Sequence, residues 1–160
     1  MPYLIDGHIK ITQSNAILRY LGRKFGLDGK SEEDKVRVDM MCDQAMDFRN
    51  GFVRLCYNPK FDDLKDDYIK NLEATLKAFS DFIGERQYFA ADYLTYPDFH
   101  MYEMLYSNQK LAPELMAKFP NLCAFVKRME GLPKVADFLC SKRSPGPMNN
   151  KMAKFGHSKI

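Results

Sequence analysis

The spacing of hydrophobic and polar residues changes after the first twelve positions. Two short runs with alternating β-branched residues flank Asp6-Gly7, and a two-residue Asp-Gly loop is typical of a type I′ turn in an antiparallel hairpin. After Thr12 the apolar residues follow a helical period, which predicts a helix opening near Gln13-Ser14. Ser14 either caps this helix or, with the free N–H groups of the first turn, binds an anionic ligand.

Two long helices are predicted next. Ser31 precedes a cluster of acids and is expected to cap a helix from Glu32 to about Cys56. Asn58-Pro59 breaks the pattern, and a second helix with apolar residues from Leu64 to Ile83 ends near Gly84. We expect the two to pack as an antiparallel pair. Val38 and Val53 broaden the stripe of the first helix, which therefore needs two partners, one in the core and one elsewhere. The residues at helical spacing in this stripe are Val36, Met40, Met41, Gln44, Ala45, Phe48, Phe52 and Leu55.

The last third of the chain predicts three shorter helices and an irregular tail. Thr95 and Asp98 are spaced as a helix cap, Phe119-Pro120 opens the next helix, and Leu132-Pro133 separates it from the last. Residues 148–160 follow a Pro-rich segment and are expected to run across the surface. The expected inward residues are Phe99, Tyr102, Leu105, Tyr106, Leu122, Phe125, Val126, Met129, Val135, Phe138 and Leu139.

Composition narrows the class of protein. The 160 residues are 46% hydrophobic and 28% charged, which describes a soluble globular protein, and no apolar run is long enough to span a membrane. A net charge of +3 is too small and diffuse for a nucleic-acid-binding surface. No secretory signal is recognisable, so we expect a cytoplasmic protein, although a truncated start would hide one.

Metal and disulfide chemistry are not expected. The three histidines are scattered, and the four cysteines share no metal-ligand spacing and lie mostly in apolar helical patterns. Four acids at 62, 63, 66 and 67 could hold a cation, but acids at the start of a helix also favour its dipole. We interpret them as structural.

The words Pro-Tyr-Leu-Ile-Asp-Gly and Ile-Thr-Gln-Ser-Asn-Ala-Ile-Leu-Arg-Tyr-Leu, at residues 2–7 and 11–21, resemble cytosolic glutathione transferases, and the Ser-Asn-Ala-Ile-Leu form is similar to the mu class. The resemblance extends to the end of the chain. It implies a mainly α fold, in which residues 1–26 are the last hairpin and helix of a thioredoxin-like domain and residues 31–160 form the all-helical C-terminal domain.

The same resemblance implies a binding site for glutathione in a homodimer. In the family a cis proline, here Pro2, follows the residue that holds the cysteinyl backbone of glutathione, here Met1. Gln13 and Ser14 match the pair that holds the γ-glutamyl end. Asp47 matches an acid that reaches across the dimer interface toward the γ-glutamyl amine of the neighbouring subunit.

The resemblance also places an electrophile beside glutathione. Tyr57 matches the mu-class tyrosine whose hydroxyl assists substrates such as epoxides, and Met46 and Val53 would line the same apolar pocket. Asn149 and the asparagine after it stand where relatives often carry an aromatic residue and a serine, which implies a more polar wall. Met and Val at this spacing are also common in a core without any ligand.

One family feature is missing from these residues. The tyrosine that stabilises the glutathione thiolate lies upstream of the position matched by Pro2, so we expect a fragment, a truncated gene product or a natural short form. The expected function is conjugation of reduced glutathione to small electrophiles, impaired in this chain. The alternative is a non-catalytic helical binding or dimerisation module, and a sigma-type enzyme is a weaker alternative within the family.

Overall fold

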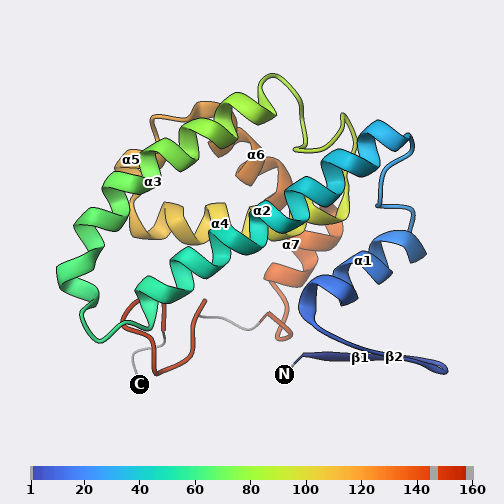
Figure 1. The fold of residues 1–160 in the computed structure, drawn as a ribbon, viewed down its shortest axis with the longest axis horizontal. Coiled ribbons are helices and arrows are strands. Elements are labelled where there is room, and N and C mark those ends of the chain that lie inside the picture. The colour runs from blue at the N-terminus through green and yellow to red at the C-terminus, as the bar shows by residue number, and fades with distance from the viewer. Residues whose placement is uncertain (1, 145–147, 158–160) are drawn as a thin grey trace. The chain divides into compact units, whose positions relative to one another are not determined.

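The protein is mainly helical, as the sequence predicts, with one hairpin at its amino-terminal end (Figure 1). The structure, a computed structural model, describes residues 2–144 and 148–157. No helix among these residues has the length and apolar character needed to cross a bilayer. The elements are β1 (Tyr3–Asp6), β2 (Ile9–Thr12), α1 (Ser14–Lys24), α2 (Glu32–Cys56), α3 (Phe61–Ile83), α4 (Tyr96–Leu111), α5 (Pro113–Met116), α6 (Pro120–Glu130) and α7 (Pro133–Leu139).

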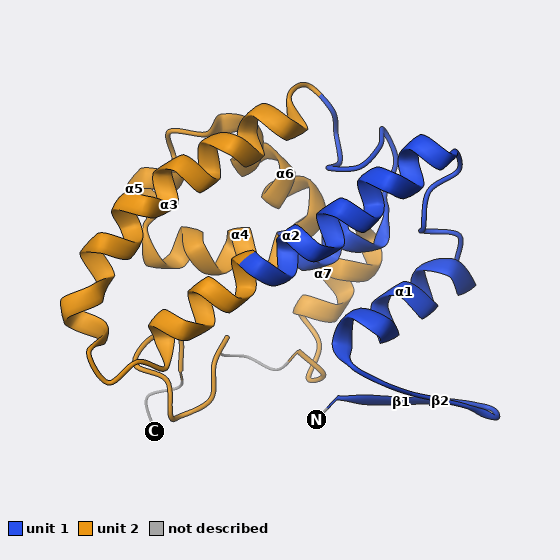
Figure 2. Ribbon diagram, viewed as in Figure 1, with its two compact units in different colours: residues 1–47, 86–101 blue, residues 48–85, 102–160 orange. Residues whose placement is uncertain are grey.

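The chain forms two compact units, coloured separately in Figure 2. The first contains residues 1–47 and 86–101, and the second contains residues 48–85 and 102–160. The hairpin and α1 belong to the first unit, and α3, α5, α6 and α7 belong to the second. Two helices, α2 and α4, begin in the first unit and end in the second.

The hairpin is antiparallel, as predicted, but its turn lies one residue later than expected. Asp6 pairs with Ile9, so the two loop residues are Gly7 and His8. Gly7 has φ 61° and His8 does not have a positive φ. A positive φ at the first loop residue alone is a feature of a type II′ turn, so the expected type I′ turn over Asp6-Gly7 is wrong.

The shift of the turn has a physical reason in the side chain of Asp6. This carboxylate accepts hydrogen bonds from the Tyr20 hydroxyl at 2.8 Å and from the Lys24 ammonium, both on α1. The two donors, Lys24 first, hold the pKa of Asp6 below its ordinary value. Asp6 therefore joins the face of the hairpin that packs on α1, together with Leu4 and Ile11.

The opposite face of the hairpin leads to our first prediction. Tyr3 and Ile5 are 74% and 60% exposed, and β1 pairs only with β2 in the described part of the chain. Because a two-stranded hairpin is marginally stable and an open apolar edge can pair with another chain, residues 1–12 should exchange amide hydrogens quickly or drive aggregation. Hydrogen exchange followed by mass spectrometry, with α4 as the protected reference, checks this. Slow exchange of the hairpin in a monodisperse sample would contradict it.

A close approach between α1 and the start of α4 closes the core of the first unit. Gly22 is buried, and a Cβ placed on it would lie 2.3 Å from Cδ1 of Tyr96, so only glycine fits there. Tyr96 packs with Val38, Cys42 and Ala90, and its backbone N–H donates to the Leu27 carbonyl at 2.9 Å.

The long helix α2 has the predicted bounds and the predicted cap. Ser31 Oγ accepts the Asp34 N–H at 3.1 Å, and the Asp34 carboxylate accepts the Ser31 N–H at 3.2 Å, which is a reciprocal capping arrangement. The core of this unit covers only part of the broad predicted stripe, and Gln44 within the stripe is exposed. Val36 and Met40 are 59% and 53% exposed, whereas Val38 is 1% exposed, because the core of this unit lies on the Val38 side.

The start of α4 is organised by a buried carboxylate. Thr95 and Asp98 are both 0% exposed. Asp98 accepts the Thr95 hydroxyl at 2.7 Å, the Thr95 N–H at 2.8 Å and the Phe89 N–H at 2.9 Å. Burial raises the pKa of the Asp98 carboxyl, and these three donors oppose the rise. The predicted Thr95 cap therefore acts by donating to Asp98, and Asp98 also fixes the loop that contains Phe89.

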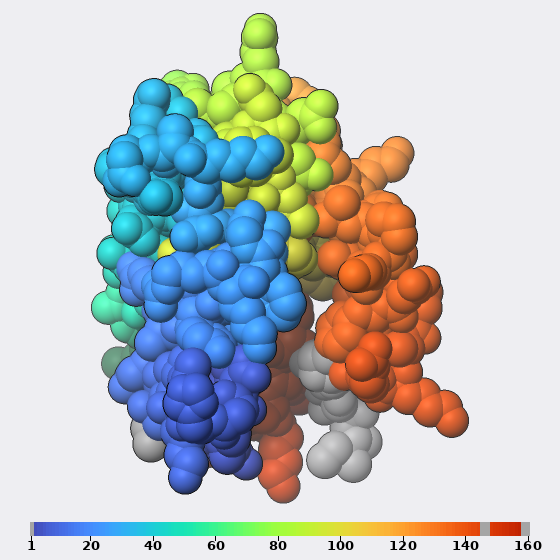
Figure 3. Space-filling view, turned by 90° about the vertical axis from the view of Figure 1, so that its right-hand side faces the viewer, coloured from blue at the N-terminus to red at the C-terminus, as the bar shows by residue number. Residues whose placement is uncertain are grey.

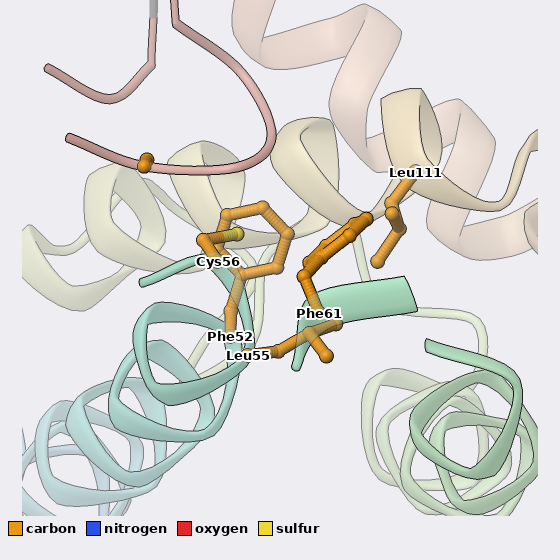
Figure 4. Close-up of a cluster of buried hydrophobic side chains, with 6 residues drawn as sticks. Phe52, Leu55, Cys56, Phe61 and Leu111 are labelled. Carbon is orange, nitrogen blue, oxygen red and sulfur yellow. The ribbon is translucent and has the colours of Figure 1, made fainter. Parts of the chain in front are cut away.

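The core of the second unit contains the end of α2, the start of α3 and the end of α4. Figure 4 shows Phe52, Leu55 and Cys56 beside Phe61 and Leu111. The irregular tail is not confined to the surface as expected, because Ala153 is 3% exposed and joins this cluster with Phe155. The Phe155 ring stacks on Phe61 at 6.2 Å and meets Phe52 edge-on at 6.3 Å.

The remaining helices confirm the prediction in part. Helix α3 begins three residues before its first predicted apolar position, and its Phe79 ring packs on Phe48 of α2 at 5.1 Å. All four inward residues predicted for α6 are buried. For α7 the prediction is wrong, since Phe138 and Leu139 are 40% and 41% exposed and none of the seven residues of this helix is buried. The short α5 was not predicted.

Candidate functional site

The candidate site residues are divided between the two units. Gln13, Ser14, Met46 and Asp47 lie in the first, and Val53, Tyr57 and Asn149 lie in the second. Met1 and its bond to Pro2, including the expected cis conformation, lie outside the described residues. Each group is described within its own unit.

Gln13 has an unusual backbone conformation at the start of α1. Its φ of 71° and ψ of 118° make it the one described residue other than glycine with a positive φ. Such conformations cost about 1–3 kcal/mol and are concentrated at functional sites. The Gln13 carbonyl accepts the Ile17 N–H at 3.0 Å, but its side chain makes no capping hydrogen bond. The strained turn thus leaves the Gln13 side chain available to a ligand.

Ser14 is the first residue of α1 and not its cap, which corrects the structural alternative proposed from the sequence. The N–H groups in the first turn of a helix have no partners within the helix and lie at the positive end of its dipole. No acidic side chain lies in this first turn, and Gln13 and Ser14 are exposed. Figure 3 shows the hairpin and α1, in blue, at the surface of the first unit. This helix start can therefore accept a carboxylate.

Met46 and Asp47 are neighbours on α2 with different environments. Met46 is half-buried, whereas Asp47 is exposed and makes no ion pair within the described residues. An exposed carboxylate without a cationic partner can bind an ammonium group. Further along the helix, Val53 is half-buried in the second unit.

Tyr57 follows the last residue of α2 and contacts the tail. Tyr57 is 37% exposed, and its backbone N–H donates to the Val53 carbonyl at 3.1 Å. The backbone N–H of Asn150 donates to the Tyr57 hydroxyl oxygen at 3.4 Å. Because this contact uses one acceptor position of the oxygen, the hydroxyl hydrogen remains available to a substrate.

Residues 149–156, beside Tyr57, are held by hydrogen bonds within the segment and by one to the end of α2. Asn149 donates its side-chain amide to the Phe155 carbonyl and its backbone N–H to the Gly156 carbonyl, each at 2.9 Å. The Lys154 N–H donates to the Cys56 carbonyl at 2.6 Å. Burial raises the pKa of the Cys56 thiol to about 11, and a hydrogen bond with Asn149 opposes the rise. Cys56 is therefore a protonated, inert thiol at neutral pH.

Sequence reasoning missed the role of this backbone contact. The Asn150 N–H donates to the Tyr57 hydroxyl oxygen from 93 positions further along the chain. Because nearly every residue type has a backbone N–H, the identity of residue 150 could not reveal this contact. For metals, no group of three His, Cys, Asp or Glu side chains in residues 2–144 and 148–157 is arranged to hold an ion.

Comparisons with known proteins match glutathione S-transferases from one end of the chain to the other. The family described as "Glutathione S-transferase, C-terminal domain" matches residues 46–142, and "Glutathione S-transferase, N-terminal domain" matches residues 1–23. "Glutathione S-transferase Mu 5" of Rattus norvegicus is 51% identical over 161 residues, covering 100% of this chain and 72% of that protein. "Glutathione S-transferase Mu 3" of Homo sapiens is 46% identical over 161 residues, with the same coverage of both.

Solved structures have the same fold. The structure of the glutathione S-transferase Blo t 8 superposes with a TM-score of 0.88 at 30% identity, over 98% of this chain and 76% of that one. The pi-class glutathione S-transferase of Onchocerca volvulus superposes with a TM-score of 0.86 at 34% identity, over 96% and 76%.

Proposed function

Because this chain belongs to the mu class of the glutathione S-transferase family, we propose that its residues hold reduced glutathione and a small electrophile for conjugation. The observation that supports this most strongly is the 51% identity over the full chain to a mu-class glutathione S-transferase. Glutathione is the co-substrate of the proposed reaction. We also propose that the protein is cytoplasmic.

The glutathione end of the proposed site lies at the start of α1. Its γ-glutamyl carboxylate would accept hydrogen bonds from Ser14 and the free first-turn N–H groups, while the Gln13 side chain binds beside it. Gln13's strained backbone and the absence of a first-turn acid support this role. Met1 would bind the cysteinyl backbone, and Asp47 of the partner subunit would bind the γ-glutamyl amine.

The electrophile end of the proposed site lies at Tyr57. Its hydroxyl would donate to a developing oxyanion, such as that of an opening epoxide, while Val53 in the same unit supplies apolar surface. The role of Met46 in lining the pocket is implied by the family resemblance alone. The Asn150 N–H orients the hydroxyl for this donation. Asn149 would border the pocket, with its amide engaged by Phe155.

Replacing Tyr57 by phenylalanine tests this role. In a version of the protein preceded by the amino-terminal segment of a mu-class relative, Tyr57→Phe should lower epoxide conjugation by about tenfold or more, since a general acid is lost. Conjugation of an aryl halide, which needs no acid at oxygen, should change by less than about threefold. Initial rates with both substrates measure this. An equal loss with both would indicate a structural role for the hydroxyl.

We also propose a homodimer, with the outer face of α2 in the interface. Val36 and Met40 lie one helical turn apart and both are exposed. Neighbouring apolar side chains on an exposed helix face favour contact with another protein surface over contact with water. Sedimentation equilibrium should give a dimer mass for the wild type and a monomer mass for Val36→Glu combined with Met40→Glu. A dimer that survives both charges would place the interface elsewhere.

The competing proposal is a helical module that dimerises or binds without catalysing. The exposed α2 face supports it equally well, and activity assays separate the two. For either function, we propose that residues 1–26 are a remnant of a thioredoxin-like domain and that residues 31–160 are the helical domain.

A further inference from the structure

A groove in the second unit lies on the side of α3 that faces α5. Its volume is about 450 Å³, within the size range of small-molecule sites. Figure 1 shows α3 and α5 side by side, and the two helices are in contact. The groove contains none of the candidate residues for glutathione or the electrophile. It is lined by residues of α3, of the end of α4, and of α5 with the residues that follow it.

The floor of the groove is apolar. Leu111 and Leu115 are 6% and 8% exposed, and Ile69 beside them is half-buried. Pro113 lacks a backbone N–H, so the start of α5 offers one donor fewer to water here. An apolar side chain of a ligand could therefore contact this floor.

The rim of the groove carries two positive and two negative side chains. Lys118 and Glu73 are paired with each other, with Nζ and Oε1 at 2.9 Å. Lys70 and Glu114 form no ion pair within the part of the chain that the structure describes. One positive and one negative charge therefore remain available, and the rim charges sum to zero.

We propose that this groove binds a small amphipathic zwitterion of the amino-acid type. Its carboxylate pairs with Lys70, its ammonium pairs with Glu114, and its apolar side chain lies on Ile69, Leu111 and Leu115. An organic anion of the same size would pair with Lys70 but be repelled by Glu114. An organic cation would pair with Glu114 but be repelled by Lys70. Because the charges are exposed and the groove is open, we expect a dissociation constant of about 1 mM.

Nuclear magnetic resonance titration of the ¹⁵N-labelled chain tests the proposal with three probes of one shape. L-Phenylalanine carries both charges, 3-phenylpropanoate lacks the ammonium, and phenethylamine lacks the carboxylate. We expect L-phenylalanine to shift the amide signals of residues 69–73 and 111–118 and to bind at least about threefold more tightly than either analogue. No shifts in these segments, or equal binding of 3-phenylpropanoate, would overturn the proposal.

Two variants assign the charges separately. Lys70→Met should weaken the binding of L-phenylalanine at least about threefold and should not weaken phenethylamine, whose ammonium Lys70 repels. Glu114→Gln should likewise weaken L-phenylalanine and should not weaken 3-phenylpropanoate, whose carboxylate Glu114 repels. Lys77→Met is the matched control, because Lys77 lies exposed on the same helix outside the groove. Loss of binding in the control, or none in the two variants, would refute the assignment. All three sites are exposed, so the fold should survive, which circular dichroism verifies.

Discussion

Replacing Asp98 by asparagine should lower the free energy of unfolding by about 3 kcal/mol. Asp98 is fully buried and its two oxygens accept three hydrogen bonds, two from Thr95 and one from the Phe89 N–H. Asparagine offers one acceptor oxygen and one NH₂ group, so in either orientation the NH₂ meets a buried donor. That donor loses its partner and cannot reach water, which is the costly case.

Equilibrium urea unfolding measures this loss, and two further variants calibrate it. Asp92→Asn, at an exposed aspartate of the preceding loop, should change stability by less than about 0.5 kcal/mol. Thr95→Ala removes one of the three donors and should cost about 1 kcal/mol, the usual value for a lost cap. If Thr95→Ala changes the free energy of unfolding by less than about 0.3 kcal/mol, and its dependence on urea concentration is unchanged, the cap is redundant. If Asp98→Asn costs no more than Thr95→Ala, the Phe89 contact does not stabilise the fold.

A preparation of residues 1–160 alone should conjugate glutathione to an activated aryl halide at least about 100-fold more slowly than a longer version. The longer version carries the amino-terminal segment of a mu-class relative, including its thiolate-stabilising tyrosine. Without such a donor, the glutathione thiol keeps a pKa of about 8.5 and only a few per cent is thiolate at neutral pH. Tyr57 would not replace the donor, because in the family it stands on the electrophile's side.

Weak binding should contribute to the same loss. Ordering the chain around Met1 would cost about 1–2 kcal/mol per residue when no preceding segment holds it. Initial rates of both preparations, with the longer one also measured after changing its tyrosine to phenylalanine, separate this contribution from thiol activation. If the 160-residue preparation comes within about tenfold of the longer one, a difference below about 1.4 kcal/mol, the tyrosine is not needed and this account of the site is wrong.

Local patterns in the sequence were sufficient wherever the determining contacts are local. The start of α2 follows from Ser31 and Asp34, which cap each other three residues apart. The inward face of α6 follows from its period, because one side of this helix is covered and the other is in water. The sequence around Gln13 and Ser14 is contiguous, so a family resemblance could propose these two residues as candidates without a structure.

Contacts between distant positions were decided only by the tertiary structure. The pattern could not tell that Val38 would be covered while Val36 and Met40 would stay exposed, because hydrophobicity does not state on which side a partner lies. Asp6 left the predicted turn because Tyr20 and Lys24 bind its carboxylate. These outcomes depend on which surfaces meet after folding.

The candidate site shows the same division. Tyr57 was identified from its neighbours in the sequence. Its hydrogen-bond partner is the backbone N–H of Asn150, in the segment for which the sequence predicted an irregular surface tail. That segment is held near Tyr57 because Ala153 and Phe155 enter the core beside Phe61. A sequence pattern records which side chains are apolar, whereas the burial of a short irregular segment depends on a cavity that only the packed helices create.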